Sequence, residues 1–237
     1  MQEKISISID KELISKADNL VNGKFIKKRS QAFEFIINEY FKGHGINHLV
    51  ILGGGLNIKI DTQVVVENVK KLMKFDLKEV YIIGDKNFEH LKKELSKLKL
   101  DVYVVEEKKL MGTAGALNLI RGKINKTFFL IFINIKFDFN LNKMVELHKQ
   151  NNSIATIGVT LTRKNTVPDN IIVEGNKIVA YNKTKNQFVN AGIYIFQPEI
   201  FSYLPKKGTF DKHIFPKLAN EGKLFSYIIT ENWEYLG

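Results

Sequence analysis

From His48 to Gln150 the chain alternates short apolar segments with amphipathic ones, and this alternation restricts its fold more than any other feature. The apolar segments have the length and composition of strands that are buried on both faces. Each segment between them carries apolar residues at the spacing of one helix face. Strands that alternate with helices favour an α/β fold, with a mostly parallel, doubly wound sheet and helices on both faces.

The expected elements are these segments and a strand-rich stretch after residue 152. We expect strands at HLVILGG, EVYIIG, DVYVVEE, TFFLIFIN, SIATIGVTL and FVNAGIYIF, and a hairpin with an EGN turn in NIIVEGNKIVAY. We expect helices at residues 64–73, 88–98, 114–120, 141–150, 198–203 and 212–219.

The first 46 residues have a different pattern. Apolar Ile5, Ile7 and Ile9 alternate with polar residues, which predicts one short strand. Asp10 is a good N-cap for a first helix, and Ser30 is a good N-cap for a second one. The predicted buried stripes of the two helices are Leu13, Ile14, Ala17, Leu20 and Val21, and then Ala32, Phe33, Ile36, Ile37 and Tyr40.

A strand and two helices in so few residues are too small to bury a core alone. Units of this size usually need a metal, disulfides or a second copy, so we expect a homodimer or a larger oligomer. The two glycines of Lys42-Gly43-His44-Gly45 interrupt the helical pattern. We therefore expect two domains, residues 1–46 and residues 47–237.

The segment KISISIDKELISKADNLVNGKFIKKRSQAFEFIINEYF resembles the ribbon-helix-helix family of DNA-binding proteins. The resemblance implies that two strands pair into a ribbon that enters the major groove of double-stranded DNA, and that the second helix holds a phosphate at its N-terminus. The alternative is a dimerisation arm whose polar strand face meets water. The resemblance assigns base edges to Gln2, Lys4, Ser6 and Ser8, and phosphates to Lys27, Lys28, Arg29 and the backbone of Ser30.

The run Gly53-Gly54-Gly55 follows the first apolar segment of residues 47–237. An α/β fold binds phosphates or nucleotides at this place, near the carboxyl end of a strand. Three glycines can equally make a tight turn, so the run alone does not decide between the two interpretations.

Several pieces of residues 47–237 resemble the sugar-phosphate nucleotidyltransferase family. In order, they are ILGGG, EEKKLMGTAGAL, TFFLIFIN followed by LNKMVELHK, IVEGNKIVAYNKT, VNAGIYIFQPEIF and FPKLANEGKLFSYIITENWEYLG. The resemblance implies a Rossmann-like fold and a reaction that joins a nucleoside triphosphate to a sugar 1-phosphate. It assigns Gly112, Thr113 and Ala114 to the nucleotide, Asn190 to the sugar, and Lys183 to the sugar and phosphate.

The predicted phosphate loop departs from the family pattern. The family's G-G-x-G-T-R has become Gly54-Gly55-Leu56-Asn57-Ile58-Lys59. Lys59 keeps the charge of the family's arginine but loses its bidentate fork. The family's P-K-P segment has no counterpart before the helix that begins near Thr62, so the loop is also shorter.

The predicted metal site departs further. The family's N-G-D aligns with Asn134-Ile135-Lys136, and a second metal-binding aspartate aligns with Tyr235. Magnesium prefers carboxylate and phosphate oxygens, so the loss of both aspartates predicts no metal site, no cofactor and no catalytic residue. Asp138 could replace one aspartate. The Lys136 ammonium could instead pair with a phosphate where the metal would stand, or it could simply be a solvated charge.

The predicted ligand-binding set joins the loop, the surviving motifs and Lys136. It consists of Gly53, Gly54, Gly55, Lys59, Gly112, Thr113, Ala114, Lys136, Lys183 and Asn190.

Charge and composition limit the partners. The 36 Lys and Arg residues against 25 Asp and Glu give a net charge of +11, which favours polyanionic partners. The absence of cysteine, of a signal-like N-terminus and of a membrane-length apolar span favours a cytoplasmic protein without a membrane partner.

Together these features favour a homodimeric transcription regulator that binds DNA through residues 1–46. Residues 47–237 would be a pseudoenzyme that senses a nucleotide, a nucleotide sugar or a sugar phosphate. The alternative is an active sugar-1-phosphate nucleotidyltransferase that uses magnesium and keeps residues 1–46 only for dimerisation. A third interpretation is an assembly protein that only organises partners.

Overall fold

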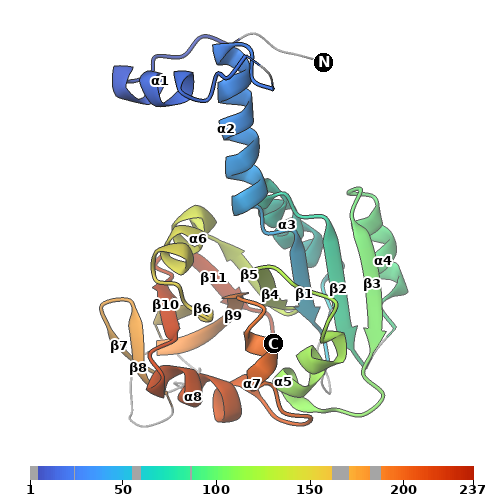
Figure 1. Ribbon diagram of the computed structural model, residues 1–237. Coiled ribbons are helices and arrows are strands. Elements are labelled where there is room, and N and C mark those ends of the chain that lie inside the picture. The colour runs from blue at the N-terminus through green and yellow to red at the C-terminus, as the bar shows by residue number, and fades with distance from the viewer. Residues whose placement is uncertain (1–4, 24, 55–59, 86, 162–170, 182–187) are drawn as a thin grey trace. The chain divides into compact units, whose positions relative to one another are not determined.

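The computed structural model describes residues 5–23, 25–54, 60–85, 87–161, 171–181 and 188–237, without the side chains of residues 38–44 (Figure 1). The chain forms two compact units, Met1–Gly45 and Ile46–Gly237, which we call the head and the body. The boundary lies directly after Gly45, although the second helix of the head continues through Gly43 to His44.

The first helix of the head is α1 (Lys11–Asp18). Asp10 caps it as predicted, because its side chain accepts a hydrogen bond from the backbone N–H of Glu12 at 2.8 Å. This cap fixes where the helix begins.

The second helix of the head, α2 (Arg29–His44), begins before Ser30, so the predicted N-cap is wrong. The Gln31 side chain accepts hydrogen bonds from the backbone N–H groups of Lys27 (2.8 Å) and Lys28 (3.2 Å). The side chain of Gln31, the third residue of the helix, thus reaches back to the N–H groups that precede the helix, as the Gln of a capping box does.

The head buries little of its apolar surface in a single copy. Residues 5–10 form no strand, because nothing in one chain pairs with them. Among the described side chains of the head, only Ala17 and Ala32 are buried hydrophobic residues. The expected burial of Leu13, Ile36 and Ile37 is therefore wrong for one copy. The exposed apolar side chains of the head are Ile5, Ile7, Leu13, Phe25, Phe35, Ile36 and Ile37.

Within the described residues the body forms a nine-stranded mixed sheet in the order β3-β2-β1-β4-β9-β6-β10-β8-β7. The neighbours from β3 to β4 are parallel, and β9 is antiparallel to both β4 and β6. The mostly parallel sheet is as predicted. The strands are β1 (His48–Leu52), β2 (Glu79–Gly84), β3 (Asp101–Glu106), β4 (Phe128–Phe132), β6 (Ala155–Leu161), β7 (Ile171–Glu174), β8 (Lys177–Tyr181), β9 (Phe188–Phe196) and β10 (Leu224–Ile228).

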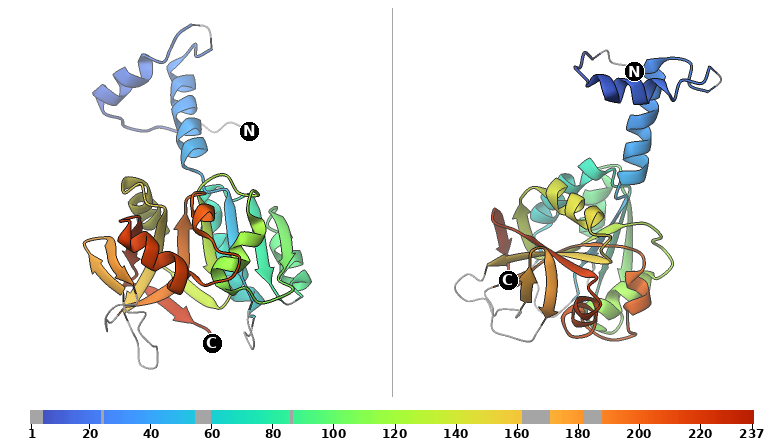
Figure 2. Two further views of the ribbon diagram at one scale, coloured as in Figure 1. Left: turned by 60° about the horizontal axis from the view of Figure 1, so that its bottom comes forward. Right: turned by 60° about the vertical axis from the view of Figure 1, so that its left-hand side comes forward.

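Helices cover both faces of this sheet, as Figure 2 shows. The strands are apolar on both sides because alternate residues enter two cores: Leu49 and Ile51 enter one, and Val50 and Leu52 enter the other. The first core includes α3 (Thr62–Leu72), α4 (Glu89–Ser96) and α6 (Leu141–Gln150). The second includes α5 (Gly112–Leu117), α7 (Ile200–Tyr203) and α8 (Phe215–Asn220). The short helices η1 (Met73–Phe75) and η2 (Asn118–Ile120) and the π-helical turn η3 (Phe210–Ile214) complete the body.

A second sheet pairs β5 (Ile135–Asp138) with β11 (Asn232–Tyr235) in antiparallel register. The sequence did not predict it, because β5 follows β4 after only two residues and resembles a continuation of that strand. Trp233 of β11 is buried, and its indole N–H donates to the carbonyl of Ala191 at 2.8 Å. This tryptophan therefore packs inside the body.

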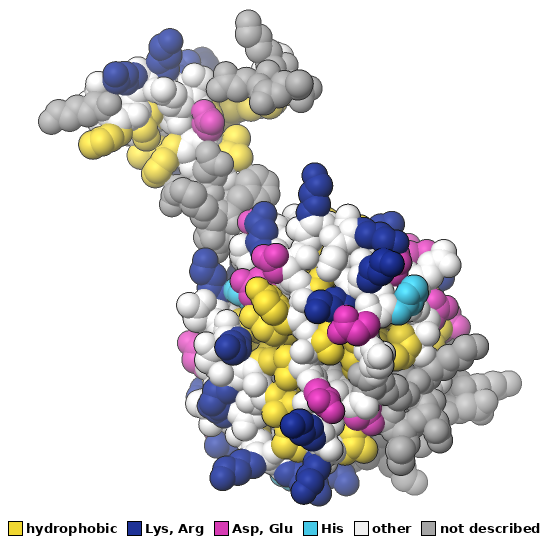
Figure 3. Space-filling view, turned by 90° about the vertical axis from the view of Figure 1, so that its right-hand side faces the viewer, with side chains coloured by type: hydrophobic (Ala, Val, Ile, Leu, Met, Phe, Trp, Pro, Cys, Tyr) yellow, Lys and Arg dark blue, Asp and Glu magenta, His cyan; other side chains and the backbone are white. Residues whose placement is uncertain are grey.

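Charged side chains are mixed on the face of the body that carries α4. Figure 3 shows Lys and Arg side chains there with Asp and Glu side chains between them. No helix in the described part of the chain combines the length and the apolarity needed to cross a membrane.

Candidate functional site

The carboxyl ends of β1 and β2 bring glycine backbones into direct contact. The N–H of Gly53 donates to the carbonyl of Ile83 at 2.8 Å. A Cβ atom on Gly84 would lie 2.9 Å from the carbonyl carbon of Gly53 and 2.9 Å from the nitrogen of Gly54. Only glycine allows this approach. Gly53 and Gly54, which we call the glycine turn, thus lie in close contact with β2 at the edge where a doubly wound sheet binds ligands.

A buried carboxylate lies beside this turn. Glu107 follows β3 and is only 4% exposed, and its backbone N–H donates to the carbonyl of Gly84 at 2.8 Å. One carboxylate oxygen accepts from the N–H of Met111 at 2.6 Å, and the other lies 2.6 Å from where a Cβ of Gly54 would stand. Glu107 lies within the segment EEKKLMGTAGAL that contains Gly112, but its sequence pattern did not single it out. A carboxylate here can accept hydrogen bonds from ligand N–H groups.

The predicted segment Gly112-Thr113-Ala114 forms the start of α5 and is held by the loop before η3. The carbonyl of Gly208 accepts from the N–H groups of Ala114 (3.0 Å) and Gly115 (3.2 Å). A Cβ on Gly112, whose φ is +75°, would lie 2.5 Å from that carbonyl oxygen. Gly112 is therefore needed for the approach of Gly208. The N–H of Ala114 is occupied by the protein itself.

The same loop connects Thr113 to the predicted sugar residue Asn190. The hydroxyl of Thr113 accepts from the N–H of Phe210 at 3.0 Å. The next residue, Asp211, accepts from the hydroxyl of Tyr181 at 3.0 Å and from the side-chain amide of Asn190 at 3.3 Å. Residues 208–211, which the sequence analysis did not single out, thus join two predicted contact segments that are far apart in the chain.

Asn134 is the second residue after β4, whereas Lys136 already belongs to β5. The N–H of Ile133 donates to the carbonyl of Leu52 at 3.0 Å, which holds the end of β4 beside the Gly53 turn. The amide of Asn134 donates to the carbonyl of Gly237 at 2.9 Å. Lys136 lies two residues further on, in β5, opposite Glu234 of β11.

The residues at this edge do not fit a magnesium ion. Asn134 offers a neutral amide, and Tyr235 offers no carboxylate and is 54% exposed. Asp138 is ion-paired with Lys71, 3.2 Å away in the last turn of α3, whereas the glycine turn precedes the first turn of that helix. No group of three or more His, Cys, Asp or Glu among the described residues could hold a metal ion.

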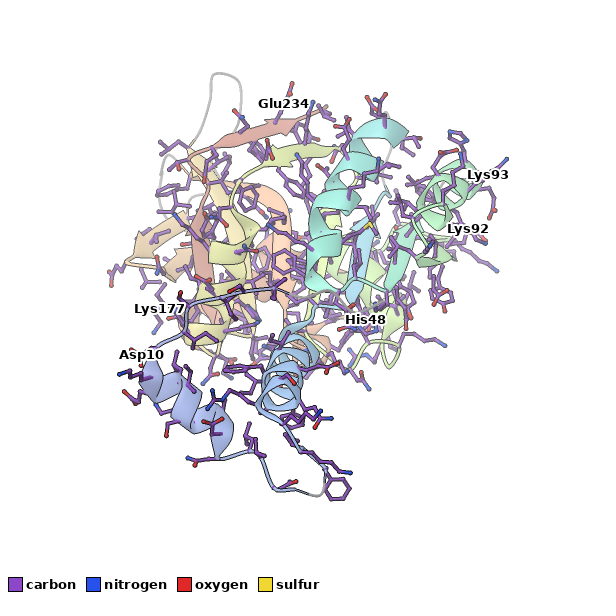
Figure 4. All side chains as sticks on the ribbon, turned by 90° about the horizontal axis from the view of Figure 1, so that it is seen from above. Asp10, His48, Lys92, Lys93, Lys177 and Glu234 are labelled. Carbon is purple, nitrogen blue, oxygen red and sulfur yellow. The ribbon has the colours of Figure 1, made fainter. Side chains whose placement is uncertain are left out.

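Lys136 lines a surface depression of about 570 Å³ between α3 and the small sheet. Glu67, Asp138 and Glu234 also line it, so its carboxylates outnumber its two lysines, Lys71 and Lys136. Figure 4 shows Glu234 at the periphery of the body, on β11. Because carboxylates outnumber lysines, the depression does not favour binding of a phosphate. The structure does not bring Lys136 to the turn that contains Gly53.

Several predicted residues cannot be located. Gln2, Lys4, Gly55, Lys59 and Lys183 lie outside the described residues, as does the shortened part of the phosphate loop.

The predicted DNA-contact residues that are described all lie on the surface of the head: Ser6, Ser8, Lys27, Lys28, Arg29 and Ser30. Arg29, however, is already paired. Its guanidinium donates to both carboxylate oxygens of Asp18 at 2.7 Å, and these hydrogen bonds lower the pKa of that carboxyl. The pair joins the end of α1 to the start of α2. Two of the five guanidinium N–H donors of Arg29 are therefore occupied by Asp18.

Comparison with known proteins gives consistent results for the body. The family model described as "Nucleotidyl transferase" matches residues 57–237. The chain is 31% identical over 157 residues to the probable mannose-1-phosphate guanylyltransferase 3 of Arabidopsis thaliana, covering 60% of this chain and 46% of that protein. It is 27% identical over 188 residues to the mannose-1-phosphate guanylyltransferase catalytic subunit beta of Xenopus tropicalis, covering 73% and 52%. The chain spans about half the length of these relatives.

Solved structures resemble the chain at low sequence identity. HddC from Yersinia pseudotuberculosis, complexed with GMP-PN, has a TM-score of 0.65 at 16% identity and covers 81% of this chain and 94% of that one. The inositol-1-phosphate CTP transferase from T. maritima has a TM-score of 0.62 at 17% identity and covers 81% and 89%. These likenesses concern the fold, and they confirm the predicted fold of the body.

Proposed function

Because the chain belongs to the nucleotidyl transferase family, we propose that its body binds a nucleotide or a nucleotide sugar at the carboxyl edge of β1 to β4. The observation that carries the proposal is the link through residues 208–211, which joins Thr113 on the nucleotide side to Asn190 on the sugar side. A ligand that spans both segments would have a nucleotide at one end and a sugar at the other.

Glu107 supports guanine as the base. Guanine presents two neighbouring donors, N1–H and the N2 amino group, to a single carboxylate, and the other common bases do not. Glu107 is buried beside the Gly54 turn, where a charged acceptor is strong because water is excluded. The names of the similar guanylyltransferases agree with this choice.

In this proposal the body binds its nucleotide ligand but does not transfer the nucleotidyl group efficiently. Nucleotidyl transfer develops charge on phosphate oxygens, and a metal held by carboxylates usually neutralises it. Lys136 and Tyr235, which align with the family's two metal-binding aspartates, do not supply such carboxylates here, and neither does Asn134. The body would then sense its ligand instead of consuming it.

Isothermal titration of the whole protein with GDP and GDP-mannose tests this proposal. We expect binding of both, and a loss of about tenfold in GDP affinity for Glu107→Gln, because a charged hydrogen-bond acceptor becomes neutral. Glu106→Gln is the matched control, since this exposed neighbour on β3 should leave affinity unchanged. No heat of binding for the wild-type protein would refute the proposal.

The second candidate function is guanylyl transfer to a sugar 1-phosphate, which the family and the names of the relatives favour. It requires release of pyrophosphate from GTP and mannose 1-phosphate in the presence of magnesium. We expect no release of pyrophosphate above the uncatalysed rate. Release that disappears in Glu107→Gln but persists in Glu106→Gln would establish the transferase instead.

The head has its own candidate function, DNA binding as a homodimer. Its exposed apolar side chains, including Ile5, Ile7 and Ile37, support a second copy as the partner that covers them. The exposed Ser6 and Ser8 would then lie on the polar face of a paired ribbon. Since Arg29 is paired with Asp18, phosphate contacts would depend mainly on Lys27 and Lys28.

Fluorescence anisotropy with labelled DNA from the protein's own promoter tests the head. We expect the Lys27→Ala/Lys28→Ala variant to bind more weakly and to show a shallower dependence on salt, because fewer counterions are released. Lys16→Ala is the control, since Lys16 is paired with Glu12 on α1. Equal DNA affinity of the wild type and the double variant would contradict DNA binding by the head, whose remaining candidate role would be dimerisation.

A further inference from the structure

The side-chain amide of Asn190 is held at both ends. Its oxygen accepts from the N–H of Gly192 at 3.1 Å, and its nitrogen donates to Asp211 at 3.3 Å. An amide with a donor on one side and a carboxylate on the other has only one favourable orientation, because a flip would point its oxygen at the carboxylate. Asp211 therefore determines which way Asn190 presents its polar atoms.

Asp211 is itself fixed by rigid neighbours. The hydroxyl of Tyr181, a side chain only 1% exposed, donates to the same oxygen of Asp211 at 3.0 Å. Asp211 belongs to η3, and the preceding residue, Phe210, is fully buried and bonded to Thr113. A charged acceptor held this firmly can set the geometry of its partner at little entropic cost.

We infer that Asp211 is a positioning residue that orients Asn190 for the sugar of a bound nucleotide sugar. This inference rests on the proposed function. It assigns Asp211 to affinity for the sugar and not to affinity for the nucleotide, because the connection to the nucleotide side that the described residues show passes through the backbone of Phe210.

The test compares GDP with GDP-mannose on the whole protein, for wild type and Asp211→Asn. This change keeps the shape of the side chain and removes its charge. We expect GDP-mannose affinity to fall about tenfold, the usual effect of losing a charged hydrogen-bond partner, while GDP affinity stays within about twofold. Asp101→Asn, an exposed carboxylate on β3, is the matched control and should change neither.

The outcomes separate the two claims. If wild type binds both ligands and Asp211→Asn weakens both equally, Asp211 has a structural role and the inference is wrong. If wild type binds neither ligand, the proposed function fails and the inference fails with it.

A measurement on the wild-type protein covers the case in which Asp211→Asn does not fold. The side-chain amide of Asn190 can be observed by ¹⁵N–¹H NMR and assigned by its loss in Asn190→Asp. We expect one of its two protons to be shifted downfield and slow to exchange, since it donates to a carboxylate. Two protons with the shifts and exchange of a solvated asparagine would overturn the inference.

Discussion

Asn134 and Lys136 are only two residues apart, yet they belong to different parts of the body. Asn134 follows β4 beside the glycine turn, and Lys136 lies in β5 over a depression rich in carboxylates. The difference decides which substitution could restore a metal site. Introducing a carboxylate at each of these two residues is therefore the most direct test of which one would face a bound magnesium ion.

We expect the variant Asn134→Asp/Tyr235→Asp to gain magnesium binding that the wild type lacks. Leu236 donates to the carbonyl of Asn134 at 2.9 Å and Tyr235 lies opposite Ile135, so residues 134 and 235 are diagonal neighbours on the two strands. Two carboxylates there would supply the hard oxygen ligands that magnesium prefers. Thermal denaturation with and without magnesium chloride measures the gain.

The matched control for this variant is Lys136→Asp/Tyr235→Asp. It introduces the same two carboxylates, but one of them in β5 beyond the end of β4. A magnesium-dependent rise in melting temperature for the control and not for the first variant would show that residue 136, not residue 134, faces the site.

His148 makes the folding stability of the body depend on pH in the acidic range. It is 1% exposed, and its ring contacts the hydroxyls of Thr156 (2.9 Å) and Ser153 (3.0 Å) and the amide of Gln197 (3.1 Å). Burial lowers the pKa of His148 to about 4, below its ordinary value of 6.5. The unfolded chain therefore takes up a proton at a higher pH than the folded chain, so stability falls as the pH drops from 6.5 to 4.

We expect this histidine to remove roughly 3 kcal/mol of stability over that interval, at 1.36 kcal/mol for each unit of pKa difference. Urea denaturation at pH 7, 5.5 and 4.5 measures the loss. His148→Gln should be less stable at pH 7 but lose less stability on acidification. His90→Gln, on the surface of α4, should keep the wild-type slope; a slope that His148→Gln leaves unchanged would assign the effect to other groups.

At the scale of elements, the alternation of strands and helices predicted the large sheet, because apolar periodicity is a local property of the chain. It could not predict the pairing of β5 with β11, whose partners are about a hundred residues apart. Glu107 and Asp211 were missed for a similar reason. Each is an ordinary acidic residue in sequence, and only its buried position or its hydrogen bonds in the fold single it out.

The contact between α5 and the loop before η3 permits a test with two glycines in similar conformations. Gly112 has φ +75° and no room for a Cβ, whereas Gly122 has φ +80° and open space around it. We expect Gly122→Ala to cost about 1–2 kcal/mol for the left-handed backbone alone. Gly112→Ala should cost about 1–3 kcal/mol more, because its Cβ meets the carbonyl of Gly208.

Chemical denaturation of the two glycine variants measures this difference, and GDP-mannose binding gives a second readout. Only Gly112→Ala should also lower the affinity for GDP-mannose, since displacement of Gly208 moves the segment that holds Thr113 and Asn190. Equal losses of stability would mean that the loop moves aside freely, and the coupling between the two segments would then be weak.

At the scale of the whole molecule, most of the positive charge lies outside the head. Residues 1–46 carry 8 basic and 6 acidic residues, a net charge of +2 out of +11. The remaining charge of the body is mixed with acidic side chains on the face in Figure 3. Sequence-specific DNA recognition would therefore depend on the geometry of a paired head, with the body adding only salt-sensitive attraction.

Everything assigned to the head thus depends on a second copy, and dimerisation is the prediction that tests it. We expect the whole protein to be a dimer, and Ile37→Asp to be a monomer, because a carboxylate would be buried without a partner in the apolar surface of α2. Sedimentation equilibrium measures the mass. Leu119→Asp makes the same change at a comparably exposed leucine of the body and should leave the dimer intact.

The two variants also locate the interface. If Leu119→Asp dissociates the protein and Ile37→Asp does not, the copies meet through the body and the head does not form a paired ribbon. If wild type is a monomer at all concentrations, the apolar side chains of the head must be covered by another partner. In that case residues 5–10 have no strand to pair with, and the ribbon on which DNA recognition depends cannot form.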